Sequence, residues 1–227
     1  MNPKEFTQGQ KYWIDQRGIS LVSLMVGLAL ALICVIVAMH TYRVSVLATR
    51  DASVSAKTYN ATAALSIQLQ KLLPQAGMRI GATATPPGGR ANVDFVLLQG
   101  ASATQNSLGG TAVVVGSVSA QGNALVWATK IDGSVKCYAI VSEATAGVIL
   151  RGPQDCVNAA TAAAGNWSTS VLLVAPDVFP RLAFSAAISR CWPYGGASAA
   201  AAKDSVQVSV TGTRYALPQP CLTNISL

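Results

Sequence analysis

Four cysteines in the C-terminal half of the chain have the residue type and spacing to react with one another. Cys137, Cys156, Cys191 and Cys221 form an even set, which predicts two disulfide bonds if the domain resides in an oxidising compartment. Four cysteines permit three connectivities. We favour Cys137–Cys156 and Cys191–Cys221, because each of these bonds closes a local loop. The fifth cysteine, Cys34, lies in an apolar run and is expected to stay a free thiol.

Residues for acid–base or nucleophilic catalysis are sparse. His40 is the only histidine, so no Ser–His or Cys–His pair is expected in the C-terminal part. Without a C-x-x-C pair, a zinc site is not expected either. The carboxylates of this part show no spacing typical of a catalytic pair; they are Asp94, Asp132, Glu143, Asp155, Asp177 and Asp204. The sequence therefore predicts a protein that is not an enzyme and uses no cofactor, metal or small-molecule substrate.

The peptide bond after Gly18 is a candidate processing site. Residues 1–18 form a polar leader with three bases and two acids, and residues 19–39 are an apolar run without a charge. A secretory signal peptide has its cleavage site after the apolar core, not before it. A cut after Gly18 would instead leave the apolar run at the N-terminus of the mature protein.

Residues 18–28 read GISLVSLMVGL, which resembles the processing motif of the type IV pilin family. That motif has Gly, an apolar residue, Ser or Thr, Leu, any residue and Glu, followed by more apolar residues. The family includes the minor pilins and the pseudopilins of type II secretion, and the segment LMVGLALALI is most similar to PilW-type minor pilins. The resemblance implies that a prepilin peptidase cuts after Gly18 and methylates the new amine of Ile19.

Ser23 departs from the motif, because the family has Glu at this place. The resemblance implies that the Glu of the family motif neutralises the methylated amine of a neighbouring subunit. A carboxylate in lipid is costly unless it is paired in this way. Serine removes both the cost and the attraction. Two interpretations are open. Ser23 marks a tip subunit that does not have to pair with the N-terminal amine of another subunit, or the serine is a neutral substitution in a minor subunit.

A single long helix must position these N-terminal residues. As a helix, the transmembrane segment 19–39 would span about 31 Å, close to the roughly 30 Å of a hydrocarbon core. From His40 to Leu73 there is no Pro or Gly, and apolar residues recur at helical spacing. Pro74 and Gly77 then end the pattern. We predict one helix of about 55 residues, with an amphipathic second half in the segment 40–80.

The segment 81–227 is predicted to be a disulfide-bonded, β-rich domain. Residues 81–90 are a turn-rich connector, Asp132-Gly133 is a hairpin signal, and 158–166 and 195–202 are expected to be loops. The predicted strands are 93–98, 112–118, 124–129, 135–142, 147–151, 171–174, 181–188 and 205–213. The predicted class is α+β, and the resemblance implies the type IV pilin fold, in which the long helix packs on an antiparallel β-sheet.

The positive net charge of the chain is compatible with DNA binding, which is kept as an alternative. The formal net charge is +7, and thirteen bases and seven acids remain once the leader is removed. The bases are scattered along the sequence and form no adjacent run, so a solvated basic surface is favoured over a nucleic-acid site. Weak binding to DNA, as in a pilin that captures DNA for transformation, is the alternative.

The resemblance implies a structural role. The expected protein is a minor type IV pilin that helps to initiate or cap pilus assembly, with its helix packed against other major and minor pilins. It would sit in the bacterial inner membrane as a single-pass protein with a periplasmic C-terminal domain, and then in the pilus at the cell surface. A minor pseudopilin of a type II secretion system is the nearest alternative, and a membrane-anchored enzyme is disfavoured by the sparse catalytic residues.

Overall fold

The computed structural model describes residues 20–80, 89–104, 106–179, 181–190, 204–213 and 217–226. The chain divides into two compact units between Ala52 and Ser53, and each is described by itself. The predictions for Gly18, Ile19, Cys191 and the loop 195–202 lie outside the described residues.

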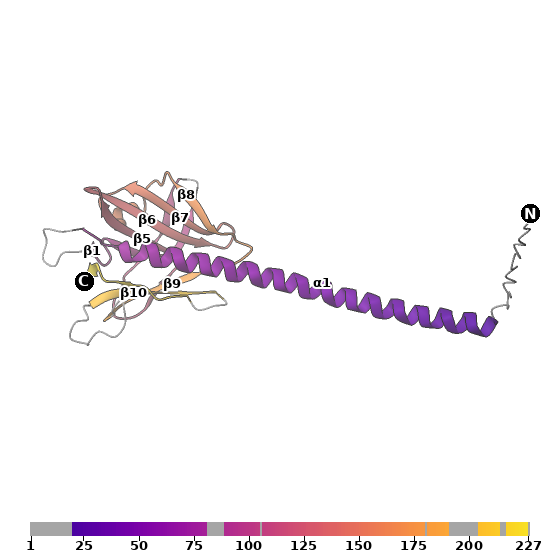
Figure 1. Cartoon of the computed structure of the whole chain (residues 1–227). Helices are drawn as coiled ribbons and strands as arrows, with labels where there is room; N and C mark the ends of the chain where they lie inside the picture. The colour runs from indigo at the N-terminus through magenta and orange to yellow at the C-terminus, as the bar shows by residue number, and fades with distance from the viewer. Residues whose placement is uncertain are drawn as a thin grey trace, which may run out of the picture. The chain divides into compact units, whose positions relative to one another are not determined.

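The long N-terminal helix is α1, Leu21–Leu72, which passes into the short 3₁₀-helix η1, Leu73–Gln75 (Figure 1). Together they make 55 residues, which confirms the predicted length. α1 ends where Pro74 lacks the backbone donor that a further helical turn needs. Gly77 then takes a positive φ of 73° and donates its N–H to the carbonyl of Ala128 at 2.8 Å, which ties the helix end to the sheet.

A six-stranded antiparallel sheet has the order β3-β2-β5-β6-β7-β8. Its strands are β2 (Phe95–Ala103), β3 (Leu108–Val113), β5 (Ala124–Ile131), β6 (Ser134–Glu143), β7 (Gly147–Asp155) and β8 (Ser170–Val174). Asp132 and Gly133 join β5 to β6 with φ values of 49° and 82°, as a two-residue type I′ hairpin turn requires. The predicted hairpin is therefore confirmed.

A second antiparallel sheet has the order β11-β10-β9-β4. Its strands are β4 (Ala120–Gly122), β9 (Ala183–Arg190), β10 (Asp204–Thr211) and β11 (Cys221–Leu222). β1 (Gly89–Arg90) and β12 (Ile225–Ser226) form a separate parallel pair. The predicted α+β class, with a long helix packed on antiparallel strands, is confirmed, although the strands form two antiparallel sheets where one was expected.

Both faces of the sheet are buried at its central strands β2, β5 and β6, where side chains alternate between two cores along each strand, whereas the edge strands β3 and β8 are largely exposed. Leu97, Leu125 and Ile140 are cross-strand neighbours that face the core shared with α1 and with β9 and β10. Val96, Val126 and Ala139 face the opposite core. That second core is closed by the segment that follows β7, which contributes Cys156, Ala159, Ala162 and Trp167.

The C-terminal part of α1 belongs to the first core. Leu65 and Leu69 are 1% and 0% exposed, and Thr62 beside them is buried, whereas Ile67 is 62% exposed. The expected amphipathic character is thus confirmed for the part of α1 that follows Ala52. Each buried leucine contributes roughly 1.5–3 kcal/mol by leaving water, so this end of α1 is a structural part of the β-rich unit.

Three predicted elements differ from the structure, the first being the connector expected at 81–90, which ends in the strand β1. The strand expected at 112–118 already ends at Val113, because the Asn92 side chain accepts from Val115 N–H (2.8 Å) and donates to the Val115 carbonyl (3.1 Å). These two bonds use the backbone N–H and carbonyl of Val115, the groups that would otherwise pair with a neighbouring strand. The loop expected at 158–166 contains the short helix α2, Ala159–Ala162, which is capped by Asn158 and Thr161.

Candidate functional site: the exposed apolar helix

The first part of α1 is apolar on every side. Between Leu21 and Met39 there is no Asp, Glu, Lys or Arg, and large side chains all round the helix are more than half exposed. Examples are Leu21 at 74%, Val22 at 67% and Ile36 at 66%. A helix that is hydrophobic all round is not stable against water and requires lipid or protein around it. By length and composition this helix can cross a membrane.

Ser23 lies in the first turn of this helix. α1 begins at Leu21, and Leu24 N–H donates to the Ser20 carbonyl at 3.2 Å, so Ser20 precedes the helix and Ser23 is its third residue. The first turn contains no acidic side chain. A carboxylate at this third position would interact favourably with the positive end of the helix dipole and could reach back to the cap. Serine provides no such charge.

The cysteines of the described residues follow the predicted chemistry. The structure contains the Cys137–Cys156 bond, which joins β6 to the segment after β7 across a separation of 19 residues. Cys221 is also disulfide-bonded, and its expected partner Cys191 lies outside the described residues. Cys34 is exposed on α1 as a free thiol.

Removal of the Cys137–Cys156 bond is expected to destabilise the β-rich unit by about 3 kcal/mol, the loop-closure entropy for a ring of this size. The variant is Cys137→Ala/Cys156→Ala, and the measurement is thermal unfolding of the full chain. Cys34→Ala is the control and is expected to leave the melting temperature unchanged, because Cys34 is exposed and unbonded. An unchanged melting temperature in the double variant would contradict this stabilising role.

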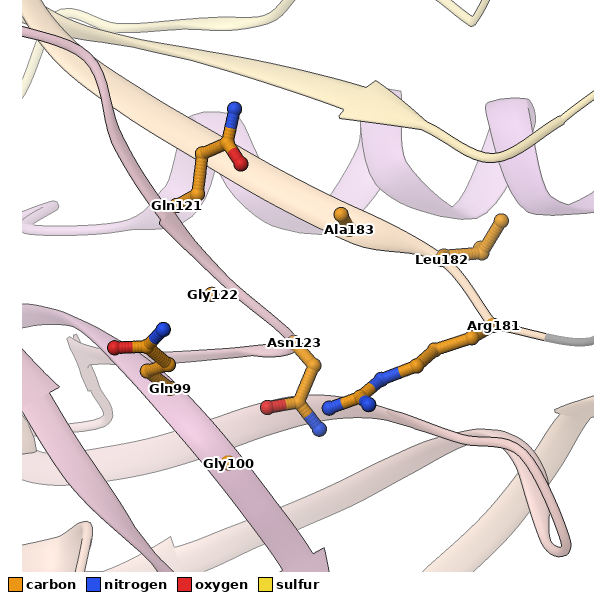
Figure 2. Close-up of a pocket in the computed structure, with 8 residues that line it drawn as sticks. All are labelled: Gln99, Gly100, Gln121, Gly122, Asn123, Arg181, Leu182 and Ala183. Atoms are coloured by element: carbon orange, nitrogen blue, oxygen red, sulfur yellow. The ribbon is translucent and has the colours of Figure 1, made fainter.

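Two shallow depressions flank Arg181 in the β-rich unit. One has a volume of about 170 Å³ and is lined by Gln99, Gly100, Gln121, Gly122, Asn123, Arg181, Leu182 and Ala183. Figure 2 shows the Arg181 side chain extending toward Asn123. The amide of Asn123 is engaged with main-chain groups, including the Ala101 N–H and carbonyl, both at 2.7 Å. Arg181 contributes the one charge of this lining, which contains no nucleophile with a neighbouring base.

The structure does not bring together the histidine and carboxylates that were considered as acid–base or metal-binding residues. His40 is exposed on α1, Asp94 accepts from Arg90 N–H at 2.8 Å, and Asp155 pairs with Lys136 at 2.7 Å. Glu143 accepts from the N–H of Ala103. Within the described ranges, no group of three or more His, Cys, Asp or Glu side chains could hold a metal ion.

One pattern was missed in the sequence. Arg43, Arg50, Lys57 and Lys71 are separated by seven, seven and fourteen residues and all belong to α1, where they are exposed. Seven residues make almost two turns, so these cations share one side of the helix. The bases are scattered along the sequence without an adjacent run, but within α1 their spacing in multiples of seven residues had not been noted. The spacing was visible in the sequence, but it acquires this meaning only once the whole segment is helical.

No family model, curated protein or solved structure matches this chain.

Proposed function

We propose that this protein is a non-enzymatic structural subunit of a type IV pilus, a minor pilin that helps to initiate or cap the filament. The observation that carries the proposal is α1. One uninterrupted helix is apolar on every side over its first part and contributes Leu65 and Leu69 to the core of a β-rich unit in its last part. Such a helix provides both a membrane anchor before assembly and a packing element for a helical filament.

Ser23 supports a position at the filament tip. A pilin in the middle of a stack benefits from a carboxylate that pairs with the amine of a neighbouring subunit, whereas a subunit without such a neighbour carries only the cost of burying that carboxylate. The first turn of α1, with no acidic residue, fits the second situation. In this proposal the protein resides in the bacterial inner membrane, with the β-rich unit in the periplasm, until it enters the pilus.

The test is to count and measure surface pili in a deletion strain. An initiating subunit acts once per filament, so we expect fewer pili of unchanged length. Ser23→Glu is not expected to improve incorporation, because an unpaired charge within the membrane costs at least about 2.5 kcal/mol. The matched control is Ser53→Glu, which places the same charge on an exposed position of the same helix, beyond the apolar run.

Two outcomes would contradict the proposal. If deletion leaves the pilus number unchanged and the Ser23→Glu chain is spread along the shaft, the protein is not an initiating tip subunit. If deletion leaves pili intact but abolishes secretion through a type II system, the protein is a pseudopilin.

A further inference from the structure

The depression of about 170 Å³ beside Arg181 lies where strands of the two sheets meet, and we call it the Arg181 depression. β4, the edge strand of the four-stranded sheet, lies against β2 of the six-stranded sheet. Asn123 N–H donates to the Leu98 carbonyl at 2.9 Å. A Cβ atom on Gly122 would lie 2.2 Å from the same carbonyl oxygen, so only glycine permits this approach. Every residue of the depression belongs to one compact unit, Ser53–Leu227.

The depression stays open because two of its lining residues carry no side chain. One is Gly122, and the other is Gly100. Gly100 lies in β2 where the register with β3 shifts between Gln99 and Ser102, and its φ is 62°. A Cβ atom on Gly100 would contact nothing within 4 Å. The space therefore results from the course of the backbone.

Arg181 brings a positive charge to this space from a fixed backbone position. The next residue, Leu182, is 0% exposed and donates its N–H to the Ser142 hydroxyl at 2.8 Å. Figure 2 shows the Arg181 side chain extending from there toward Asn123. The amide of Asn123 is already bonded to main-chain groups, and no salt bridge between described residues includes Arg181. The guanidinium therefore has no anionic partner within the described part of the chain.

The charge of the lining favours an anion in the Arg181 depression over an anion in the depression next to it. Gln99, Gln121 and Asn123 are neutral amides, so Arg181 makes the net charge of the Arg181 depression positive. The neighbouring depression, of about 220 Å³, is lined by both Arg181 and Glu143. The negative charge of Glu143 would repel an anion bound there.

We propose that the Arg181 depression binds a carboxylate group, which the guanidinium of Arg181 holds through two parallel N–H···O bonds. The planar guanidinium matches the geometry of a carboxylate in such a pair. A single cation also matches the single charge of a carboxylate, whereas phosphate groups are typically bound by clusters of Arg. The exposed amides of Gln99 and Gln121 can donate to, or accept from, polar atoms next to the carboxylate.

The volume restricts the ligand to a small group. Sites for cofactors and drug-sized molecules usually measure roughly 300–1,000 Å³, and the Arg181 depression, at about 170 Å³, is well below that range. The carboxylate therefore belongs either to a small free acid or to one residue of a polypeptide, as an acidic side chain or as a chain end. This inference does not rest on the proposed function.

The test measures the binding of small carboxylates to full-length protein in nanodiscs of zwitterionic phosphatidylcholine, by ligand-observed NMR. Propionate is the free acid, and propionamide has the same shape without the charge. We expect propionate to bind about tenfold more tightly than propionamide. Two short peptides distinguish the sources: one has its only carboxylate at the C-terminus, and the other has it on an internal Glu and ends in an amide. The carboxylate that binds most tightly identifies the source.

Arg181→Gln is expected to weaken binding of propionate about tenfold, or about 1.4 kcal/mol. Arg181→Lys keeps the charge but loses the second parallel bond, so we expect a smaller loss of about threefold. Arg79→Gln is the matched control, because it makes the same replacement at an exposed arginine of the same unit outside the depression. It is expected to leave binding unchanged. All three variants are expected to keep the melting temperature of the wild type, since both arginines are exposed.

Three outcomes would overturn the proposal. The first is that neither propionate nor either peptide binds. The second is that Arg79→Gln weakens binding as much as Arg181→Gln does, because the effect would then be one of net charge. The third is that inorganic phosphate binds as tightly as propionate, which would indicate an adventitious ion only. None of these outcomes bears on the pilin proposal, which is tested by pilus number and by the N-terminus of the mature chain.

Discussion

Replacement of Gly18 by phenylalanine is expected to abolish N-terminal processing, so that every chain in the membrane keeps residues 1–18. A peptidase that cuts after Gly18 must approach the backbone closely at a residue without a side chain, and a large ring at this position blocks that approach. The wild-type chain is expected to begin at Ile19 with a methylated amine. Mass spectrometry of the N-terminal peptide from membrane-extracted protein measures both outcomes.

Gly18→Ala is the matched control, and we expect partial processing, because a methyl group adds little bulk. Wild-type protein that still begins at Met1 would sink the pilin proposal. A start beyond Met39 would do so as well, since the apolar run would then have been removed as an ordinary signal peptide.

Leu69→Asp is expected to unfold the β-rich unit. Leu69 is 0% exposed in the core formed by α1 and the two sheets. Truncation of such a leucine costs about 2–5 kcal/mol, and an unpaired buried carboxylate adds several more. The total of at least about 5 kcal/mol is comparable with the whole stability of a typical domain. Thermal unfolding of the purified full chain, followed by circular dichroism, is the measurement.

Ile67→Asp is the control on the same helix. Ile67 is 62% exposed, so the same new charge is expected to change the free energy of unfolding by no more than about 0.5 kcal/mol. Leu69→Ala provides an intermediate case that still folds, with a loss of about 3 kcal/mol. If Leu69→Asp and Ile67→Asp melt at the same temperature, this part of α1 does not contribute to the core as described.

Local pattern was enough to predict the elements that depend on neighbouring residues. α1 follows from an apolar run and a long stretch free of Pro and Gly, and its end follows from Pro74. The β5–β6 hairpin follows from Asp132-Gly133, since these two residues tolerate the positive φ that the turn needs. Proximity along the chain also favoured the Cys137–Cys156 bond over its alternatives.

For the candidate site, the sequence analysis identified the apolar part of α1 and the position of Ser23, and it missed the common side of the helix on which Arg43, Arg50, Lys57 and Lys71 lie. Successive members of this set are seven or fourteen positions apart, so a search for adjacent Lys and Arg did not find them. Their common side exists only because the helix continues without a break to Leu72.

Long-range contacts decided the rest. Strands as short as β1 and β12 carry no readable pattern, and they exist because Gly89 and Arg90 pair with Ile225 and Ser226 far along the chain. The end of β3 depends on Asn92, 23 residues away from Val115. The sequence by itself determined the long helix, the hairpin and most strands, because each depends on residues close together. The tertiary structure decided how those strands divide into two sheets, because that division depends on which distant apolar faces are buried together.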